Sequence, residues 1–330
     1  MLPLVTALLL AVGPAPRAGV VFSFADPAIV ESSGLVVDAA SGLFVTTNDS
    51  GDQGRLFVVD PADGTTVGVT RWRSSTGQAD PVDVEALAPA GPGAVWVGDI
   101  GDNDGVRDSV RLFRVPVGRG TRDVVVDSYE LIYPDGARDA ESLLLDSTGR
   151  VLVVTKGLFG GEVLRSEQPL ALDRPATLTQ VGDAWPLVTD AALFPDGRHL
   201  VVRSYGSAAI YSYPALRQVG DVDLPDQQQG EGVAVDAAGQ VFLSSEGEGS
   251  QVLRVALPAG VRRVVAPDEP TPTPSPSPSP SPRVPDPEPA PVKAADPSTA
   301  ADPAWWHWGL GGLLGLGVVV ALLRTLRPRG

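Results

Sequence analysis

Aspartate and asparagine side chains gather directly after one apolar run of this 330-residue sequence. The run VWV ends at Val97, and the eleven residues from Asp99 to Ser109 hold four aspartates and one asparagine. Oxygen donors of this kind are the ligands that Ca2+ prefers, usually about six to eight of them at about 2.3–2.6 Å. The same residues also suit a polar turn between two strands. Both interpretations depend on the elements that position the loop.

Composition excludes most other site chemistry. The sequence has no cysteine, so disulfides, thiol catalysis and thiolate zinc sites are excluded. It has two histidines, His199 and His307, and neither is expected near the acidic residues, as a Ser-His-Asp triad would require. The net charge of -15 argues against nucleic-acid binding, because a phosphate backbone needs a basic surface.

Five stretches share one pattern: a polar start, an apolar run, a turn with Asp or Gly, and a second apolar run. They are 31–51, 83–103, 139–157, 188–206 and 229–247, and each continues into a third strand-like segment. Val- and Leu-rich runs joined by DG, TG and AG are hairpin signals. Equivalent positions recur at intervals of 41 to 56 residues. That period, with four strands per unit, is typical of a β-propeller.

We therefore predict an all-β fold, a β-propeller with five blades. Six blades are the alternative, if a degenerate unit escapes the count. The segment VVFSFA (21–26) precedes the first unit and is expected to complete the last blade as its outer strand. The stretch GLFGG (157–161) lacks the P-loop pattern and predicts a tight turn.

The alignment of the blades brings two polar sets to one face. Four acids lie at the beginning of the innermost strands, where the first blade has Ser33: Glu85, Glu141, Asp190 and Glu231. The ends of the second strands carry Asn48, Asp49, Asp99, Asp102, Lys156 and Arg203. Because these two strands form an antiparallel hairpin, the start of one lies beside the end of the other. Both sets should therefore converge at one mouth of the central channel.

Carboxylates that face one another raise each other's pKa values unless a metal or a basic side chain compensates. We predict a Ca2+ site formed by acids of both sets: Glu85, Glu141, Asp190, Glu231, Asp99 and Asp102. Ligand contacts are expected from Lys156, Arg203, Asn48 and Asp49. Two alternatives stay open: a structural role, in which the acids bind backbone amides of the neighbouring blade, and a ligand site without metal.

The two ends of the sequence have the composition of targeting and anchoring segments. Residues 1–18 predict a secretory signal peptide, with a buried N-terminal strand as the alternative. Residues 19–265 carry the propeller, and 266–304, with TPTPSPSPSPSP, predict a disordered Pro-rich stalk. Residues 305–323 are an apolar run of 19, which predicts a single transmembrane helix, and 324–330 a basic cytoplasmic tail.

Several of these strings resemble a known group of proteins. ESSGL with TTNDSG, VEALA with VGDIGDN, YPDGARDAESLLLD and QGEGVAVD resemble secreted or membrane-anchored propellers of high-GC bacteria, described as WD40-like or esterase-like phytase-type. The resemblance covers roughly residues 28–250 and implies a propeller. More distantly, the acidic mouth is similar to those of calcium propellers of the phytase, gluconolactonase and paraoxonase kinds. Some of those enzymes use histidines that this sequence lacks, and fold analogy does not establish an activity.

Together these features predict a membrane-bound extracellular propeller on a stalk, with a single C-terminal span. It would bind a ligand or partner at the acidic channel mouth, with Ca2+ as the candidate cofactor. The alternative is a calcium-dependent hydrolase of phosphate or carboxylic esters, in which a metal-bound water attacks and Lys156 and Arg203 stabilise negative charge. Binding is favoured because no complete catalytic constellation can be identified.

Overall fold

The structure is a computed structural model that describes residues 18–49, 51–77 and 81–266. The predicted signal peptide up to residue 17, most of the predicted stalk, the predicted transmembrane helix and the predicted tail lie outside the described residues. Within them, no helix is both long and apolar enough to span a bilayer.

The described residues form five four-stranded antiparallel units, each of them one blade, and parallel pairing joins the second and third into one sheet. The first blade contains β2 (Ser32–Val37), β3 (Phe44–Asn48), β4 (Arg55–Val59) and β5 (Thr66–Ser74). The second contains β6 (Val84–Pro89), β7 (Ala94–Asp99), β8 (Val110–Pro116) and β10 (Ser128–Ile132). The third contains β11 (Ala140–Leu145), β12 (Val151–Thr155), β13 (Gly161–Ser166) and β14 (Ala176–Ala184).

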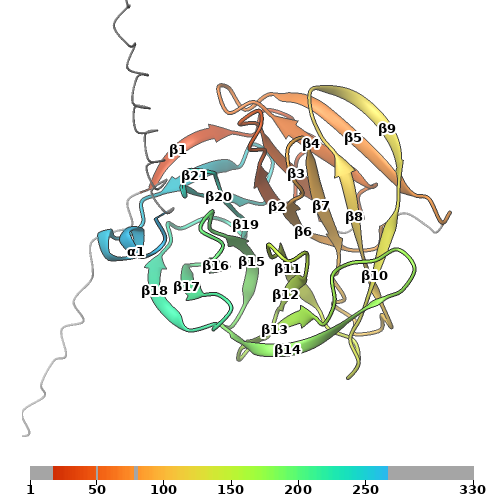
Figure 1. Cartoon of the computed structure of the whole chain (residues 1–330). Coiled ribbons are helices and arrows are strands. Elements are labelled where there is room, and N and C mark those ends of the chain that lie inside the picture. The colour runs from red at the N-terminus through yellow and green to blue at the C-terminus, as the bar shows by residue number, and fades with distance from the viewer. Residues whose placement is uncertain (1–17, 50, 78–80, 267–330) are drawn as a thin grey trace, which may run out of the picture. The chain divides into compact units, whose positions relative to one another are not determined.

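The fourth and fifth blades complete the ring. The fourth contains β15 (Val188–Leu193), β16 (His199–Ser204), β17 (Ser207–Ser212) and β18 (Gln218–Asp223). The fifth contains β19 (Gly230–Val235), β20 (Val241–Ser245), β21 (Gln251–Val255) and β1 (Ala18–Ser23). The innermost strands β2, β6, β11, β15 and β19 contact one another in this order, and β19 contacts β2. They surround the centre of Figure 1, and the outer strands lie at its rim. The described residues thus form a closed β-propeller of five blades.

The N-terminal strand closes the ring, as predicted. β1 pairs with β21, and Ala18 lies opposite Val255. The strand begins three residues before the predicted segment, at Ala18, which is also where the predicted signal peptide ends. After β21, the short helix α1 (Ala259–Val264) packs Val261 against the fourth blade, where Gly220 of β18 leaves space for it.

An additional strand joins neighbouring blades on the outside. β9 (Gly120–Val126) leaves the second blade and pairs in parallel with β5 of the first. The chain returns as β10, which pairs with β8 of its own blade and in parallel with β14 of the third. Hydrogen bonds therefore connect the outer edges of blades one, two and three. Among the described residues, no such pairing joins the fourth and fifth blades to their neighbours.

Apolar side chains between the blades form the core. An inner strand such as β11 is buried along almost its whole length, whereas β9 alternates between exposed and half-buried residues. This difference follows from packing an inner strand on both faces. Between the fifth and first blades, Phe22, Phe44 and Phe242 meet edge to face, the arrangement that aromatic quadrupoles favour.

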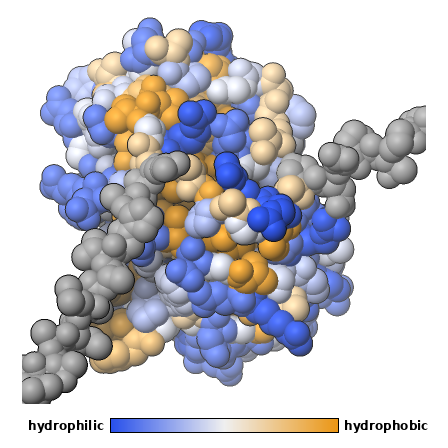
Figure 2. Space-filling view, turned by 90° about the vertical axis from the view of Figure 1, so that its left-hand side faces the viewer, coloured by the Kyte–Doolittle hydropathy of each residue, from blue (hydrophilic) through white to orange (hydrophobic). Residues whose placement is uncertain are grey.

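The surface is mostly hydrophilic on the side that carries α1, with some apolar residues between (Figure 2). Val20 of β1, Val219 of β18 and Val264 of α1 are exposed there. The channel also has an apolar end. A cavity of about 180 Å³ lies between the last residues of the five inner strands, lined by 35–37, 87–89, 143–145, 191–193 and 233–235. The polar residues of the channel therefore lie at its other end.

Candidate functional site

The predicted polar sets lie on one face, which we call the channel mouth: the beginnings of the five inner strands and the loops beside them. In every blade the register of the inner hairpin shifts immediately after its first residue pair. These are β-bulges, which re-aim a side chain next to the shift. In the second and third blades the bulged residues are Glu85 and Glu141. The bulge therefore turns these acids toward the channel.

At the junction of the fourth and fifth blades, the acid Asp190 accepts hydrogen bonds from backbone amides. Asp190 is fully buried, and its two carboxylate oxygens accept hydrogen bonds of 2.7 Å from the N–H groups of Ala191 and Val233. Burial raises the pKa of Asp190, although these two amides oppose the rise. Val233 belongs to the next blade, so this carboxyl joins two blades. That is the structural role that the sequence left open.

Arg203, expected as a ligand residue, lies inside the same junction. Its guanidinium is fully buried and donates to the carbonyl oxygens of Gly232 and Ser244 and to Gln227 Oε1, at 2.5–2.9 Å. Burial lowers the pKa of Arg203 to about 10, although the nearby acids oppose this shift. A Cβ atom at Gly230 would lie 2.0 Å from Nη2, so the chain needs glycine there. Arg203 is an inter-blade clamp.

In the third blade, Glu141 pairs with Lys156. The Lys156 ammonium donates to Glu141 Oε1 at 2.8 Å; the carboxyl is buried, whereas 28% of the lysine side chain is exposed. Burial raises the pKa of Glu141 even though Lys156 opposes the rise. Burial also raises the pKa of Glu231, in the fifth blade, to about 7, with Lys156 opposing and Glu246 adding to it. Lys156 therefore remains the accessible basic group at this part of the mouth.

At the junction of the first and second blades, three acids come together. One carboxylate oxygen each of Asp49, Asp83 and Glu85 lies within 4.8 Å of the others. Asp83 and Glu85 are 8% and 5% exposed, and neither forms an ion pair with a Lys or Arg among the described residues. Burial raises the pKa of Asp83 to about 6, with Asp49 adding to the rise. It also raises the pKa of Glu85, to which Glu141 and Asp49 add.

The loop after β7 packs closely against this acidic trio at Gly101. A Cβ atom at Gly101 would lie 2.5 Å from Asp83 Oδ2 and 2.7 Å from Glu85 Oε1. The other Asp83 oxygen, Oδ1, is buried without a hydrogen-bond partner. Leaving a buried carboxylate oxygen unpaired costs free energy, of the order of 1–3 kcal/mol or more. The trio thus brings together oxygen donors of three acids, and Asp83 and Glu85 form no ion pair with a described basic side chain.

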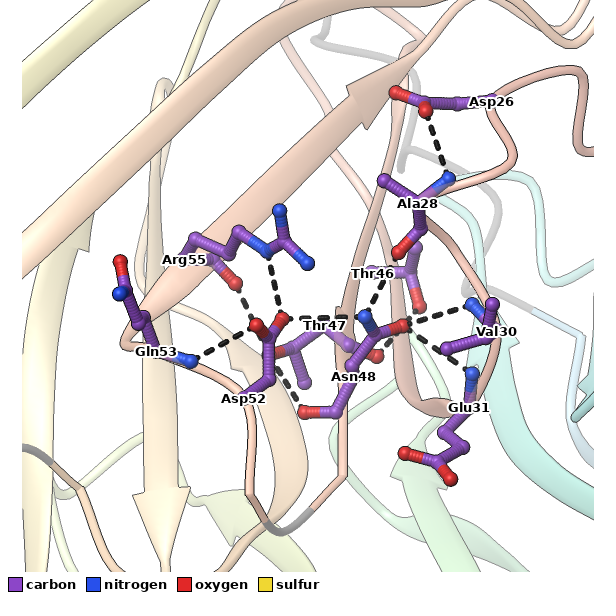
Figure 3. Close-up of polar contacts among 10 residues, drawn as sticks. All are labelled: Asp26, Ala28, Val30, Glu31, Thr46, Thr47, Asn48, Asp52, Gln53 and Arg55. Atoms are coloured by element: carbon purple, nitrogen blue, oxygen red, sulfur yellow. Dashed lines mark hydrogen bonds and ion pairs between the residues drawn. The ribbon is translucent and has the colours of Figure 1, made fainter.

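The side chain of Asn48 contacts the segments before β2 and after β3 rather than lining the mouth (Figure 3). Its side chain is buried and uses both polar ends, accepting from the N–H groups of Val30 and Glu31 and donating to Ala28 O and Asp52 Oδ2. The next residue, Asp49, donates its N–H to Glu31 O at 3.0 Å. Asn48, expected as a ligand residue, therefore fixes the backbone from which Asp49 extends.

Asp99 and Asp102, predicted as metal ligands, are fully or almost fully buried and hold the loop itself. Asp99 Oδ1 accepts from the N–H groups of Val82 and Asp83 and pairs with Arg107 at 2.9 Å. Asp102 accepts from the N–H groups of Val106 and Arg107, both at 2.9 Å. The structure therefore brings Glu85 and Asp49 of the predicted residues together with Asp83. It engages Asp190, Asp99 and Asp102 with backbone amides instead.

Apolar residues surround the mouth in a way that the sequence did not indicate. Leu158 and Phe159, at the tip of the β12–β13 turn, are 68% and 94% exposed. The turn is fixed by glycine: Gly160 has φ +148, and the carbonyl of Gly157 accepts from the N–H of Leu187 at 2.9 Å. The remaining exposed apolar residues of the mouth loops are Val30, Val82, Val106, Leu187 and Tyr205. We call this set the apolar rim.

Comparisons with known proteins add little to this geometry. No family model matches the sequence, and no curated protein is significantly similar to it. A solved gluconolactonase of Xanthomonas campestris aligns with 73% of this chain and 90% of its own, at 12% identity and a TM-score of 0.43. A likeness this distant says nothing about activity. The propeller fold rests on the strand topology, and the WD40-like or phytase-type resemblance stays a prediction.

Proposed function

We propose that this protein is a cell-surface binding module that docks a partner at the channel mouth, and that the partner carries basic and apolar groups. The observation that carries the proposal is the apolar rim, above all Leu158 and Phe159 on a turn fixed by glycine. An exposed phenylalanine at a rigid tip gains nothing from folding. Aromatic side chains of this kind are enriched where protein interfaces bury their central contacts.

The charge of the mouth indicates which charge the partner carries. Acids dominate its loops: Glu31, Asp49, Asp52, Asp104, Asp108, Asp135, Asp139, Glu246 and Glu248. The basic side chains Arg55 and Arg107 are each paired with an aspartate, and Lys156 with Glu141. Complementary potentials steer association and select partners, so an acidic rim favours a basic surface.

Calcium is part of the proposal as the candidate cofactor of the mouth. The oxygen-only donor set of the acidic trio fits Ca2+, and its members Asp83 and Glu85 form no ion pair with a described basic side chain. Bound there, calcium would supply the positive charge that lets the three acids stay ionised. Asn48 and Asp99 would then act as positioning residues.

Display at the surface is proposed from the sequence of the two ends. The signal peptide (1–18), the stalk (266–304) and the span (305–323) would place the propeller outside the cell. The chain enters β1 and leaves β21 at the channel end opposite the mouth. The mouth itself is therefore not where the described chain begins or ends.

Site-specific photo-crosslinking tests the proposed docking. A benzoyl-phenylalanine is placed at Phe159 or at Leu172, a 58% exposed residue of the β13–β14 loop at the other end of the ring, in cells that express the full chain. We expect an adduct only at position 159, with a contacted peptide rich in Lys or Arg. Equal crosslinking at both positions, or none at 159, would contradict the proposal.

Hydrolysis is the second candidate, and Lys156 is the observation in its favour. Its ammonium is partly exposed beside the acidic trio, where it can stabilise negative charge on a phosphate or carboxyl ester. Turnover of generic esters by the calcium-loaded chain is the test, with Lys156→Met as the variant. A rate that calcium does not raise, or that the variant retains, excludes this candidate.

A further inference from the structure

We propose that Asp49, Asp83 and Glu85 bind one divalent cation, Ca2+ in preference, and that this ion joins the first blade to the second. The inference rests on the calcium part of the proposed function and not on the partner. It adds the ligand set and a role: the ion does at this junction what Arg203 does between the fourth and fifth blades.

The distances within the trio suit a single ion. Oxygens that bind one Ca2+ at about 2.3–2.6 Å lie no more than about 5.2 Å from each other, and the three oxygens lie within 4.8 Å. Three carboxylates bring up to six oxygens, and water can complete the usual six to eight ligands. Mg2+ demands a near-ideal octahedron at about 2.0–2.1 Å, which three side chains from two blades are less suited to build.

Asp83 points to a cation independently of the clustering. It is more than nine-tenths buried, and its Oδ1 lacks a hydrogen-bond partner among the residues that the structure describes. At the same time Asp99 fixes its backbone by accepting from the N–H of Asp83 at 3.0 Å. A residue held in place while its own carboxylate oxygen is left unpaired is arranged for a group that the protein does not supply.

Gly101 lets the carboxylates of Asp83 and Glu85 lie directly against the loop after β7. Any side chain at this position would collide with both Asp83 and Glu85. The adjacent carbonyl of Gly101 is fixed by Arg107, which donates to it at 2.7 Å. Arg107, a basic group close to the junction, thus holds the loop and pairs with Asp99.

The trio spans two blades, which gives the ion its role. Asp49 follows β3 of the first blade, whereas Asp83 and Glu85 lie at the start of β6 of the second. Ser33 of the first blade already reaches across, with its hydroxyl 2.7 Å from Glu85 O. An ion bound by all three acids would fix the Asp49 loop to β6.

The test is calcium titration of the purified full chain after chelator treatment, followed by thermal unfolding. An ion that binds only the folded state raises Tm, by several degrees at about one hundred times Kd. The variants are Asp83→Asn and Glu85→Gln, and the control is Glu246→Gln, an acid of the same mouth outside the trio. We expect the first two to weaken calcium affinity at least tenfold and the control to keep it.

Hydrogen exchange then tests the role of the ion. Calcium should slow amide exchange in the loops 49–54 and 82–86 and leave 230–233, at the Arg203 junction, unchanged. No Tm shift in the wild type, wild-type affinity in Asp83→Asn, or protection confined to other blades would each overturn the inference. Calcium binding without an adduct at Phe159 would sink only the proposed docking, and the reverse result only this inference.

Discussion

At two junctions of the ring, the buried acid at the start of an inner strand has opposite kinds of neighbours. Between the fourth and fifth blades, Asp190 is met by two backbone amides, and Arg203 spans the gap. Between the first and second blades, Glu85 stands at the equivalent strand position but meets Asp49 and Asp83. The acid at the start of an inner strand is therefore a structural element by default. At Glu85 it becomes a candidate site, because two further carboxylates, those of Asp49 and Asp83, lie close to it there.

The largest effect is expected at the neutralised junction. Arg203→Met should lower the free energy of unfolding by about 3–5 kcal/mol, because it leaves two carbonyl oxygens buried without their donor and removes the buried positive charge near Asp190. Urea unfolding measures the difference. The control, Arg254→Met at an exposed residue, should change stability by less than about 0.5 kcal/mol. Similar losses in both variants would show that Arg203 is not a clamp.

The pH dependence of stability should reveal the other junction. The pKa of Asp83 is about 6 in the folded protein, against 3.8 ordinarily, so the folded state binds more protons between these pH values. Without calcium, the contribution of Asp83 to the free energy of unfolding is therefore fully present below about pH 4. It falls by about 2–3 kcal/mol as pH rises through 6. Calcium should restore it at pH 7. Tm measured against pH in chelator and in calcium gives both curves, and identical curves would contradict the prediction.

Replacing the acid by its neutral amide should change the free energy of unfolding in opposite directions at the two junctions. Asp190→Asn should cost about 1–3 kcal/mol, because one of the two amides it serves loses its acceptor. Asp83→Asn in chelator should leave stability unchanged or raise it, because it removes a buried charge that has no ion-pair partner among the described residues. Chemical unfolding of both variants under the same conditions compares them. Destabilisation of both by equal amounts would remove the distinction between the junctions.

The smallest effect on stability is expected at the apolar rim. Phe159→Ala removes a side chain that is 94% exposed, so the free energy of unfolding should change by less than about 0.5 kcal/mol. Loss of partner binding with unchanged Tm would assign the residue to recognition. A large loss of stability would instead show that the phenylalanine packs against its own chain.

The sequence was sufficient to predict the ring of five blades, but it was not sufficient to predict the chemistry of the channel mouth. Strand runs, turns and spacing predicted five blades and the closing N-terminal strand, because hairpin pairing and alternation are local properties. Asp49 and Asp83 belong to different blades, and their approach depends on bulges and on which donors a neighbouring blade presents. Arg203 shows the same limit: its position at a strand end suggested an open site, yet its side chain turns into the junction.

Two further features of the sequence have structural roles that their local pattern alone does not predict. The glycine of GDIGDN, Gly101, is required because the carboxylates of two other residues fill the space beside it. The turn GLFGG was correctly expected to be tight, but tightness alone does not say that Leu158 and Phe159 point outward. Exposure of a turn residue depends on what the adjacent loops cover, which only the assembled blades define.

The pairing of β1 with β21 also has a consequence for how the molecule forms. Ala18 and Val255 are neighbours in space although almost the whole propeller separates them in the chain. Contacts of such long sequence separation slow folding, because the chain must be ordered before they form. During synthesis from the N-terminus, β1 emerges first and waits unpaired until β21 follows. The first strand made is thus the last to find its place, and the ring stays open until then.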